Sequence, residues 1–123
     1  MIKVLVKTSV FALLAACLVA AQSSKSSTTP AATFTGEWKV GLGVGGESFL
    51  ITLEKGGKAT KSHGSPNGTW TVFGDEARIT WSDGWHDVIR RTGNKWEKAA
   101  YAPGKSFSDA PDNITGATRT EPL

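Results

Sequence analysis

The stretch "GTWTVFGDEARITWSDGWHDVIRR" (residues 68–91) decides the fold. Apolar and polar residues alternate along it, as they do in strands that bury one face. The dipeptides Gly74-Asp75 and Asp83-Gly84 interrupt the alternation with residues that favour turns. Connections this short join antiparallel neighbours, because parallel strands need crossovers of about a dozen residues. The stretch therefore predicts three consecutive antiparallel strands.

The same pattern continues on both sides of this stretch. We expect about seven strands, at residues 34–41, 47–54, 58–63, 68–73, 76–82, 85–91 and 95–101. Glycines interrupt every window that has helical periodicity, so we expect no helix between residues 34 and 107. An open sheet would leave its apolar face wet and two edges unpaired. The sequence thus predicts an all-β antiparallel meander that closes into a small barrel or half-barrel.

The first residues of the chain indicate export. Lys3 and Lys7 precede an apolar run at residues 10–21, which is shorter than the roughly 20 residues that span a bilayer. This pattern predicts a signal peptide over residues 1–21. We favour cleavage after Ala21, which gives a secreted or periplasmic protein. The alternative is lipidation of Cys17, since Leu-Ala-Ala-Cys resembles a bacterial lipobox and would anchor the protein to the envelope membrane.

Composition divides the rest of the chain into a linker, a domain and a tail. Residues 22–33 are rich in Ser, Thr, Pro and Ala and predict a disordered linker. Residues 34–107 form the expected barrel domain, and residues 108–123 are expected to be an irregular tail. The charge of +3 comes from 14 basic and 11 acidic residues. Loss of Lys3 and Lys7 leaves 12 against 11, a charge of +1 with no basic block, so no nucleic-acid partner is expected.

A G-x-W motif, Gly36-Glu37-Trp38, opens the first expected strand. Together with the meander and the export signal, it resembles the lipocalin and avidin-like calycin barrels. The chain is also similar to short secreted bacterial proteins of unassigned function. The resemblance implies that Trp38 plugs the closed end of the barrel. Because the domain is short, a narrow barrel filled by its own side chains is as good an expectation as a ligand cavity. Four tryptophans are expected to point inward: Trp38, Trp70, Trp81 and Trp96.

The turn at Asp83-Gly84 fixes the register of the next hairpin. Asp-Gly favours a two-residue type I′ turn, which pairs Ile79 with Val88 and leaves Asp87 facing solvent. A three-residue turn would instead oppose Asp87 to Ile79 and bury a carboxylate. We therefore expect the two-residue turn.

Residues of catalytic type near this turn do not form a triad. His86 and Asp87 are adjacent on one strand and point to opposite faces, so Ser82 cannot meet a histidine braced by that aspartate. Two histidines without metal-ligand spacing predict neither a metal nor another cofactor. We therefore expect no enzyme, but an exported binding protein for a small apolar or sugar-like ligand or a surface partner. The alternative is a structural or envelope-interaction module without a ligand pocket.

The candidate binding residues surround the same turn. Trp85 lies on the wetter face of the hairpin, and tryptophans beside charged groups often anchor contacts. The other candidates are His86, Arg90 and Arg91.

Overall fold

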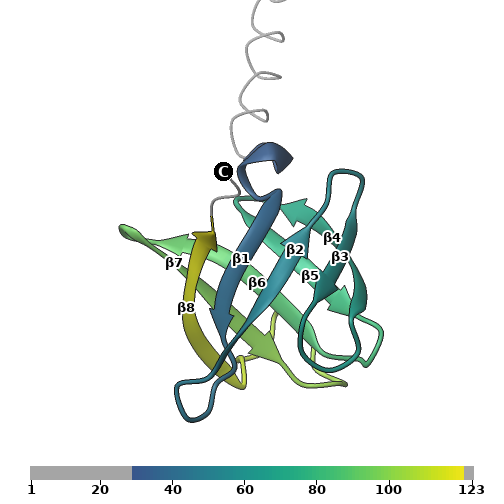
Figure 1. Ribbon diagram of the computed structural model, residues 1–123, viewed down its shortest axis with the longest axis vertical. Helices are drawn as coiled ribbons and strands as arrows, with labels where there is room; N and C mark the ends of the chain where they lie inside the picture. Colours follow the sequence, from purple (N-terminus) through teal and green to yellow (C-terminus); the bar gives the residue numbers. More distant parts are fainter. Residues whose placement is uncertain (1–28, 121–123) are drawn as a thin grey trace, which may run out of the picture.

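The computed structural model describes residues 29–120, which form a closed antiparallel barrel (Figure 1). Its eight strands are β1 (Gly36–Gly41), β2 (Ser48–Leu53), β3 (Lys58–Lys61), β4 (Asn67–Phe73), β5 (Glu76–Trp81), β6 (His86–Thr92), β7 (Lys95–Tyr101) and β8 (Asn113–Thr120). Each strand pairs with the next, and β8 pairs with β1 to close the barrel. The predicted antiparallel meander and its closure are confirmed. Between residues 29 and 120, no helix is long and apolar enough to cross a membrane.

The strand that closes the barrel lies where an irregular tail was expected. Asn113–Thr120 of the 108–123 segment forms β8, which pairs with both β7 and β1. Its inward residues explain why the prediction was wrong. Ala117 contributes to the apolar core, but Arg119 also faces inward, with its guanidinium 4.4 Å from the ring of Trp38. A strand whose inward positions hold a small residue and a cation has no hydrophobic alternation to detect.

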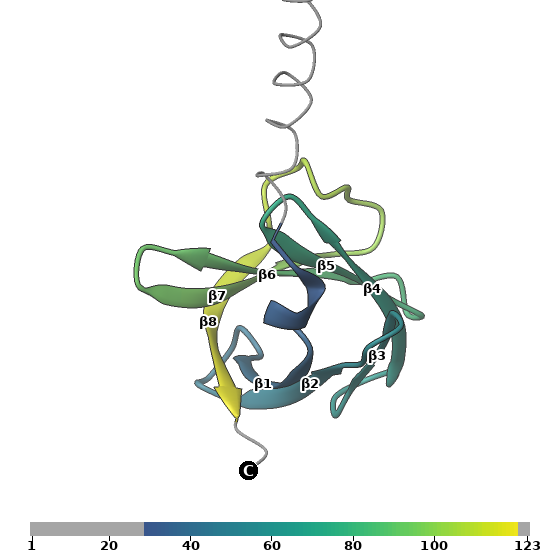
Figure 2. The ribbon, with the colours of Figure 1, turned by 90° about the horizontal axis from the view of Figure 1, so that it is seen from above.

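The expected linker also has structure where it reaches the barrel. Residues Ala31–Thr33 form a 3₁₀ turn, labelled η2, so the described end of the 22–33 segment is ordered. The signal peptide, Cys17 and residues 22–28 lie outside the described residues. Seen from above, η2 lies over one end of the barrel (Figure 2).

The barrel end beneath η2 is filled around Trp38. Phe34 and Trp38 are fully buried, and the Trp38 Nε1–H donates to the carbonyl of Phe34 at 2.9 Å. The guanidinium of Arg119 packs over the Trp38 ring and donates to the carbonyls of Thr33 and Thr35. These contacts attach the 3₁₀ turn to the first and last strands and close this end of the barrel.

Most of the barrel interior is packed rather than hollow. The prediction that four tryptophans point inward is confirmed, since Trp38, Trp70 and Trp81 are buried in the core and Trp96 packs against it. The other buried members of this core are Phe34, Val40, Ile51, Leu53, Ala59, Ala77, Ile79, Ile89 and Ala117. The residues come from all eight strands and the segment after η2, so one core supports the whole barrel.

The β5–β6 hairpin has the register that sequence analysis rejected. Ile79 opposes Asp87, and Trp81 bonds to Trp85 in the same register, so residues 82–84 form a three-residue turn. The Trp81 carbonyl accepts the Gly84 N–H at 3.0 Å, while the Trp81 N–H donates to the carbonyl of Trp85 at 2.9 Å. Gly84 has φ +96°, as a glycine at the bulge of such a turn requires. The expectation of a two-residue turn is therefore wrong, and Asp87 lies inside the barrel.

The same register shift moves two residues to the outside. His86 and Val88 were expected on the core face, yet both lie on the outer face of β6. They are covered there by the β7–β8 connection, residues 102–112, whose Phe107 ring centroid is 5.1 Å from that of His86. Val88 packs with Ala99, Tyr101 and Phe107 in a small second cluster. The outer face of β6 is thus apolar because a loop, rather than the core, covers it.

We expect Gly68→Ala to destabilise the fold by about 1–3 kcal/mol, the usual cost of overpacking. A Cβ at Gly68 would lie 2.6 Å from both the carbonyl oxygen of Thr80 and a ring carbon of Trp81. The control is Gly116→Ala on β8, where a Cβ meets nothing within 4 Å and the change should be neutral or stabilise by up to about 1 kcal/mol. Urea unfolding of both variants measures the difference, and equal stabilities would contradict the prediction.

Candidate functional site

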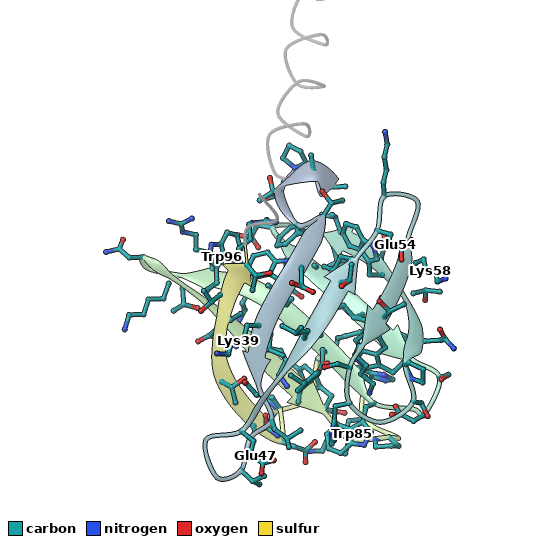
Figure 3. The ribbon with its side chains drawn as sticks, in the orientation of Figure 1. Lys39, Glu47, Glu54, Lys58, Trp85 and Trp96 are labelled. Carbon is teal, nitrogen blue, oxygen red and sulfur yellow. The ribbon has the colours of Figure 1, made fainter. Side chains whose placement is uncertain are left out.

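The barrel end opposite η2 holds a cavity. Figure 3 shows Trp85 at this end and Trp96 near the end that η2 covers. The cavity has a volume of about 190 Å³, and we call it the mouth cavity. Its lining comes from strands and from the loops at that end: Leu42, Phe49, Lys61, His63, Gly64, Asp83, Trp85, Asp87, Lys98, Ala100 and Asn113.

Asp87 and Lys98 form the inner wall of the mouth cavity. They lie on the adjacent strands β6 and β7 and are only 4% and 2% exposed. The Trp81 Nε1–H donates to Asp87 Oδ2 at 2.8 Å, which fixes the orientation of the carboxylate. Lys98 Nζ lies 3.9 Å from Asp87 Oδ1, beyond the distance of a direct hydrogen bond. The two groups are therefore an ion pair with a gap between them.

A second ion pair lies nearer the opening. Lys61 Nζ donates to Asp83 Oδ2 at 3.0 Å and lies 4.7 Å from the centroid of the Trp81 ring. Burial raises the pKa of Asp83, but hydrogen bonds from the Trp85 N–H and from Lys61, with the charge of Lys61, lower it further, so the net shift is downward. A lowered pKa in the folded state stabilises the protein above the unfolded-state pKa, and this contribution disappears as the pH falls through the folded-state pKa.

Burial disfavours both charges of the inner pair. Loss of water raises the pKa of Asp87, and the attraction of Lys98 and the hydrogen bond from Trp81 offset only part of that effect. Burial also lowers the pKa of Lys98, where the attraction of Asp87 opposes the shift and the charge of Lys61 adds to it. Both shifts favour the neutral forms of these two groups over the charged forms.

The remaining lining combines an amide with aromatic rings. Asn113 carries a buried Oδ1 that has no hydrogen-bond partner among the described residues. The rings of Phe49 and His63 lie 5.6 Å apart, and Lys98 Nζ lies 4.9 Å from the centroid of Phe49. Trp85 is 36% exposed. The mouth cavity thus offers hydrogen-bonding groups inside and aromatic surface toward the opening.

Of the four residues proposed from the sequence, Trp85 lines the mouth cavity. His86 lies outside the barrel under the 102–112 loop, and its buried Nδ1 has no hydrogen-bond partner within residues 29–120. Arg90 Nε donates to Glu97 Oε2 at 3.0 Å on the outer surface. Arg91 lies 5.2 Å from the ring of Trp96, at the other end of the barrel. The structure does not bring these four residues together.

Sequence reasoning missed Lys61, Asp87 and Lys98, although a signal for the two lysines was present. Trp96 was expected to face inward, and a period of two along a strand then places Lys98 inward as well. Ala59 is likewise buried two residues before Lys61. Neither position was assigned, because a lysine is expected to be exposed unless its partner is known.

Nothing in the mouth cavity has the arrangement of a metal centre. Across residues 29–120, no three His, Cys, Asp or Glu side chains are grouped as metal ligands. Comparisons of the chain with protein-family models, with curated proteins and with solved structures gave no match. The side chains that line the mouth cavity are therefore the basis for inferring its chemistry.

Proposed function

We propose that this chain is an exported, non-catalytic binding protein that takes a small hydroxylated, sugar-like ligand into the mouth cavity. The observation that carries the proposal is the 3.9 Å gap between Lys98 Nζ and Asp87 Oδ1. A hydroxyl oxygen within hydrogen-bond distance of both atoms fits this gap. It would accept from the amine and donate to the carboxylate, and a hydroxyl group can do both at once.

Charge supports a neutral ligand over an ion. Both lysines of the mouth cavity are already matched by aspartates, Lys61 by Asp83 and Lys98 by Asp87. An added carboxylate would meet the charge of Asp87, and an added ammonium would meet that of Lys98. Either ion would also lose its water at a site whose charges are already balanced. A hydroxyl group avoids both costs.

Size and lining narrow the class of ligand further. The volume of about 190 Å³ lies below the roughly 300–1,000 Å³ of pockets for larger molecules. Trp85 and Phe49 offer aromatic surface beside the polar groups of the wall. A ligand with hydroxyls on its edge and C–H groups on its face, such as a monosaccharide or cyclic polyol, uses both kinds of surface.

A matched set of six-membered rings tests the proposal. We expect inositol and cyclohexanol to bind at least about tenfold more tightly than cyclohexylammonium or cyclohexanecarboxylate, because each ion meets a like charge. Asp87→Asn should weaken inositol binding about tenfold or more, the usual value of a hydrogen bond to a charged group. Isothermal titration calorimetry or NMR titration measures these affinities.

Glu97→Gln is the matched control. It disrupts the Arg90–Glu97 ion pair, which joins the same two strands on the outside of the barrel. Inositol affinity should be unchanged in this variant. Tighter binding of either ion, or equal losses in Asp87→Asn and Glu97→Gln, would overturn the assignment.

The wider setting is part of the same proposal. A barrel with one end closed around Trp38 and a cavity at the other is compatible with a calycin-like binding protein. The export signal predicted at residues 1–21 would place that cavity in the periplasm or outside the cell. Processing at Ala21 or lipidation at Cys17 would decide between a free and an anchored form.

A second candidate is an envelope-interaction module. Val44 in the β1–β2 loop and Ile114 on β8 are 64% and 50% exposed and line one surface groove. Exposed apolar residues of this kind can mark a contact with another protein. This candidate is favoured if none of the ring compounds binds and substitution of Val44 abolishes a contact with the envelope.

A further inference from the structure

We propose that Lys98 captures small neutral aldehydes as a reversible imine inside the mouth cavity. The inference rests on the proposed function in one respect: a small neutral molecule must reach the inner wall of this cavity. It goes further in naming a covalent bond and the carbonyl class of ligand. Small hydroxyaldehydes carry both the hydroxyl that the wall can bind and the carbonyl that the amine can attack.

The position of Lys98 is that of a reactive rather than a solvated lysine. It is 2% exposed, it borders a cavity, and its Nζ has no described hydrogen-bond acceptor within hydrogen-bond distance. A lysine becomes nucleophilic when it is desolvated or lies near another cation. Both conditions hold here, because burial and the charge of Lys61 lower the pKa of Lys98. More of this amine is therefore neutral, with a free electron pair, than of a solvated lysine at the same pH.

Asp87 is positioned to move the protons that imine formation requires. The Lys98 nitrogen attacks the carbonyl carbon, the C–N bond forms, and the carbonyl π electrons pass to oxygen. Asp87 accepts a proton from the nitrogen and gives a proton to the oxygen, which yields a carbinolamine. A second proton then passes from the nitrogen to the hydroxyl oxygen by way of Asp87, the C–O bond breaks so that the oxygen leaves as water, and the nitrogen electron pair completes the C=N bond. Amine and aldehyde thus become imine and water, and addition of water reverses every step.

Lys61 is not equivalent, although it lines the same cavity. Its Nζ donates to Asp83 Oδ2 at 3.0 Å, so this amine is already engaged in a direct ionic hydrogen bond, whereas Lys98 Nζ lies 3.9 Å from Asp87 Oδ1. Asp87 also faces Lys98 with one carboxylate oxygen already fixed by Trp81. The geometry therefore selects one lysine of the two.

Reductive trapping tests the proposal on the protein without any substitution. The protein is incubated at neutral pH with glycolaldehyde and sodium cyanoborohydride, and mass spectrometry of proteolytic peptides then gives the labelling rate at each lysine. Lys39, Lys55 and Lys58 are exposed and serve as internal controls. We expect Lys98 to label at least about tenfold faster than these three, because its amine is desolvated and Asp87 can transfer the protons. In urea the difference should disappear.

Two variants test whether fast labelling of Lys98 depends on proton transfer by Asp87 or only on the burial of the amine. Asp87→Asn removes the proton carrier, and it also removes the charge that opposes the lowered pKa of Lys98. We expect the loss of proton transfer to dominate, so labelling of Lys98 should slow about tenfold or more while that of Lys39 is unchanged. Glu97→Gln, one residue from Lys98 but on the outer face, should change neither rate. If Lys98 labels no faster than the exposed lysines of the wild-type protein, the imine proposal is wrong. If inositol still binds in that case, the proposed function stands without the imine. If inositol does not bind and Lys98 shows no preferential labelling, both proposals are wrong.

Discussion

Trp38→Ala should lower the free energy of unfolding by about 3–5 kcal/mol, the range for large buried aromatics replaced by alanine. Trp38 is fully buried, and its ring meets that of Trp96 edge-to-face with centroids 5.3 Å apart. The substitution also removes the Nε1–H bond to Phe34 and the ring beneath the guanidinium of Arg119. A domain of this size has a total stability of about 5–15 kcal/mol, so the substitution removes a large share of it.

Trp85→Ala is the control for that substitution. Trp85 is a tryptophan of the same barrel, but it is 36% exposed at the opposite end. The Trp85→Ala substitution should lower the free energy of unfolding by no more than about 1–2 kcal/mol, because Trp85 buries less apolar surface than Trp38. Urea unfolding followed by circular dichroism measures both variants. Equal losses would show that Trp38 does not hold the closed end together.

Removing either member of the Asp87–Lys98 ion pair should lower the free energy of unfolding by about 3–5 kcal/mol. Asp87→Leu leaves the Lys98 amine buried without its counterion, and it also removes the acceptor of the Trp81 Nε1–H. Lys98→Met leaves the Asp87 carboxylate without its cation. The cost in each case comes from the group that remains, because a buried charge loses its water and finds no partner.

The double variant Asp87→Leu with Lys98→Met distinguishes this cause from lost packing. With both charges gone, most of the stability should return, and the remaining loss should be about 1–3 kcal/mol for the unpartnered indole N–H of Trp81. A double-mutant cycle from urea unfolding gives the coupling energy of the pair. Losses that simply add would contradict the prediction.

The stability of the Lys98→Met variant should also depend on pH, and the direction of the change follows from the pKa of Asp87. Burial already raises the folded-state pKa of Asp87 above its ordinary value of 3.8, and Lys98 is one of the groups that oppose this rise. Without Lys98 the pKa rises further. A raised folded-state pKa gives stability that is present below the unfolded-state pKa and is lost as the pH rises through the folded-state value. This variant should therefore be closest to wild type in acid and should weaken toward neutral pH.

The sequence predicted the strands well and the closure only in part. Alternation and turn residues located seven strands, and the absence of helical periodicity excluded a helical cover for the sheet. The eighth strand escaped detection because its inward positions include Arg119, which is satisfied by backbone carbonyls and by Trp38 from distant segments. The pairing energy of β8 comes from β1 and β7 together, and no local pattern records it.

The candidate site was the hardest feature to predict, for the same reason. Burial of Asp87 was rejected because a lone buried carboxylate is costly. That argument holds only without partners, and the partners come from β7 and β5, through Lys98 and the indole of Trp81. These two partners on the flanking strands offset the cost of burying Asp87, so the three-residue turn is acceptable.

What the sequence by itself determined is the all-β class, the order of seven strands and the four tryptophans that point inward. These depend on periodicity and turn chemistry, which act between near neighbours along the chain. Only the tertiary structure decided the eighth strand, the register of the β5–β6 hairpin and the ion pairs of the mouth cavity. Each of these depends on whether a polar group finds a partner in another segment of the chain, and the alternation within one strand does not record where that partner lies.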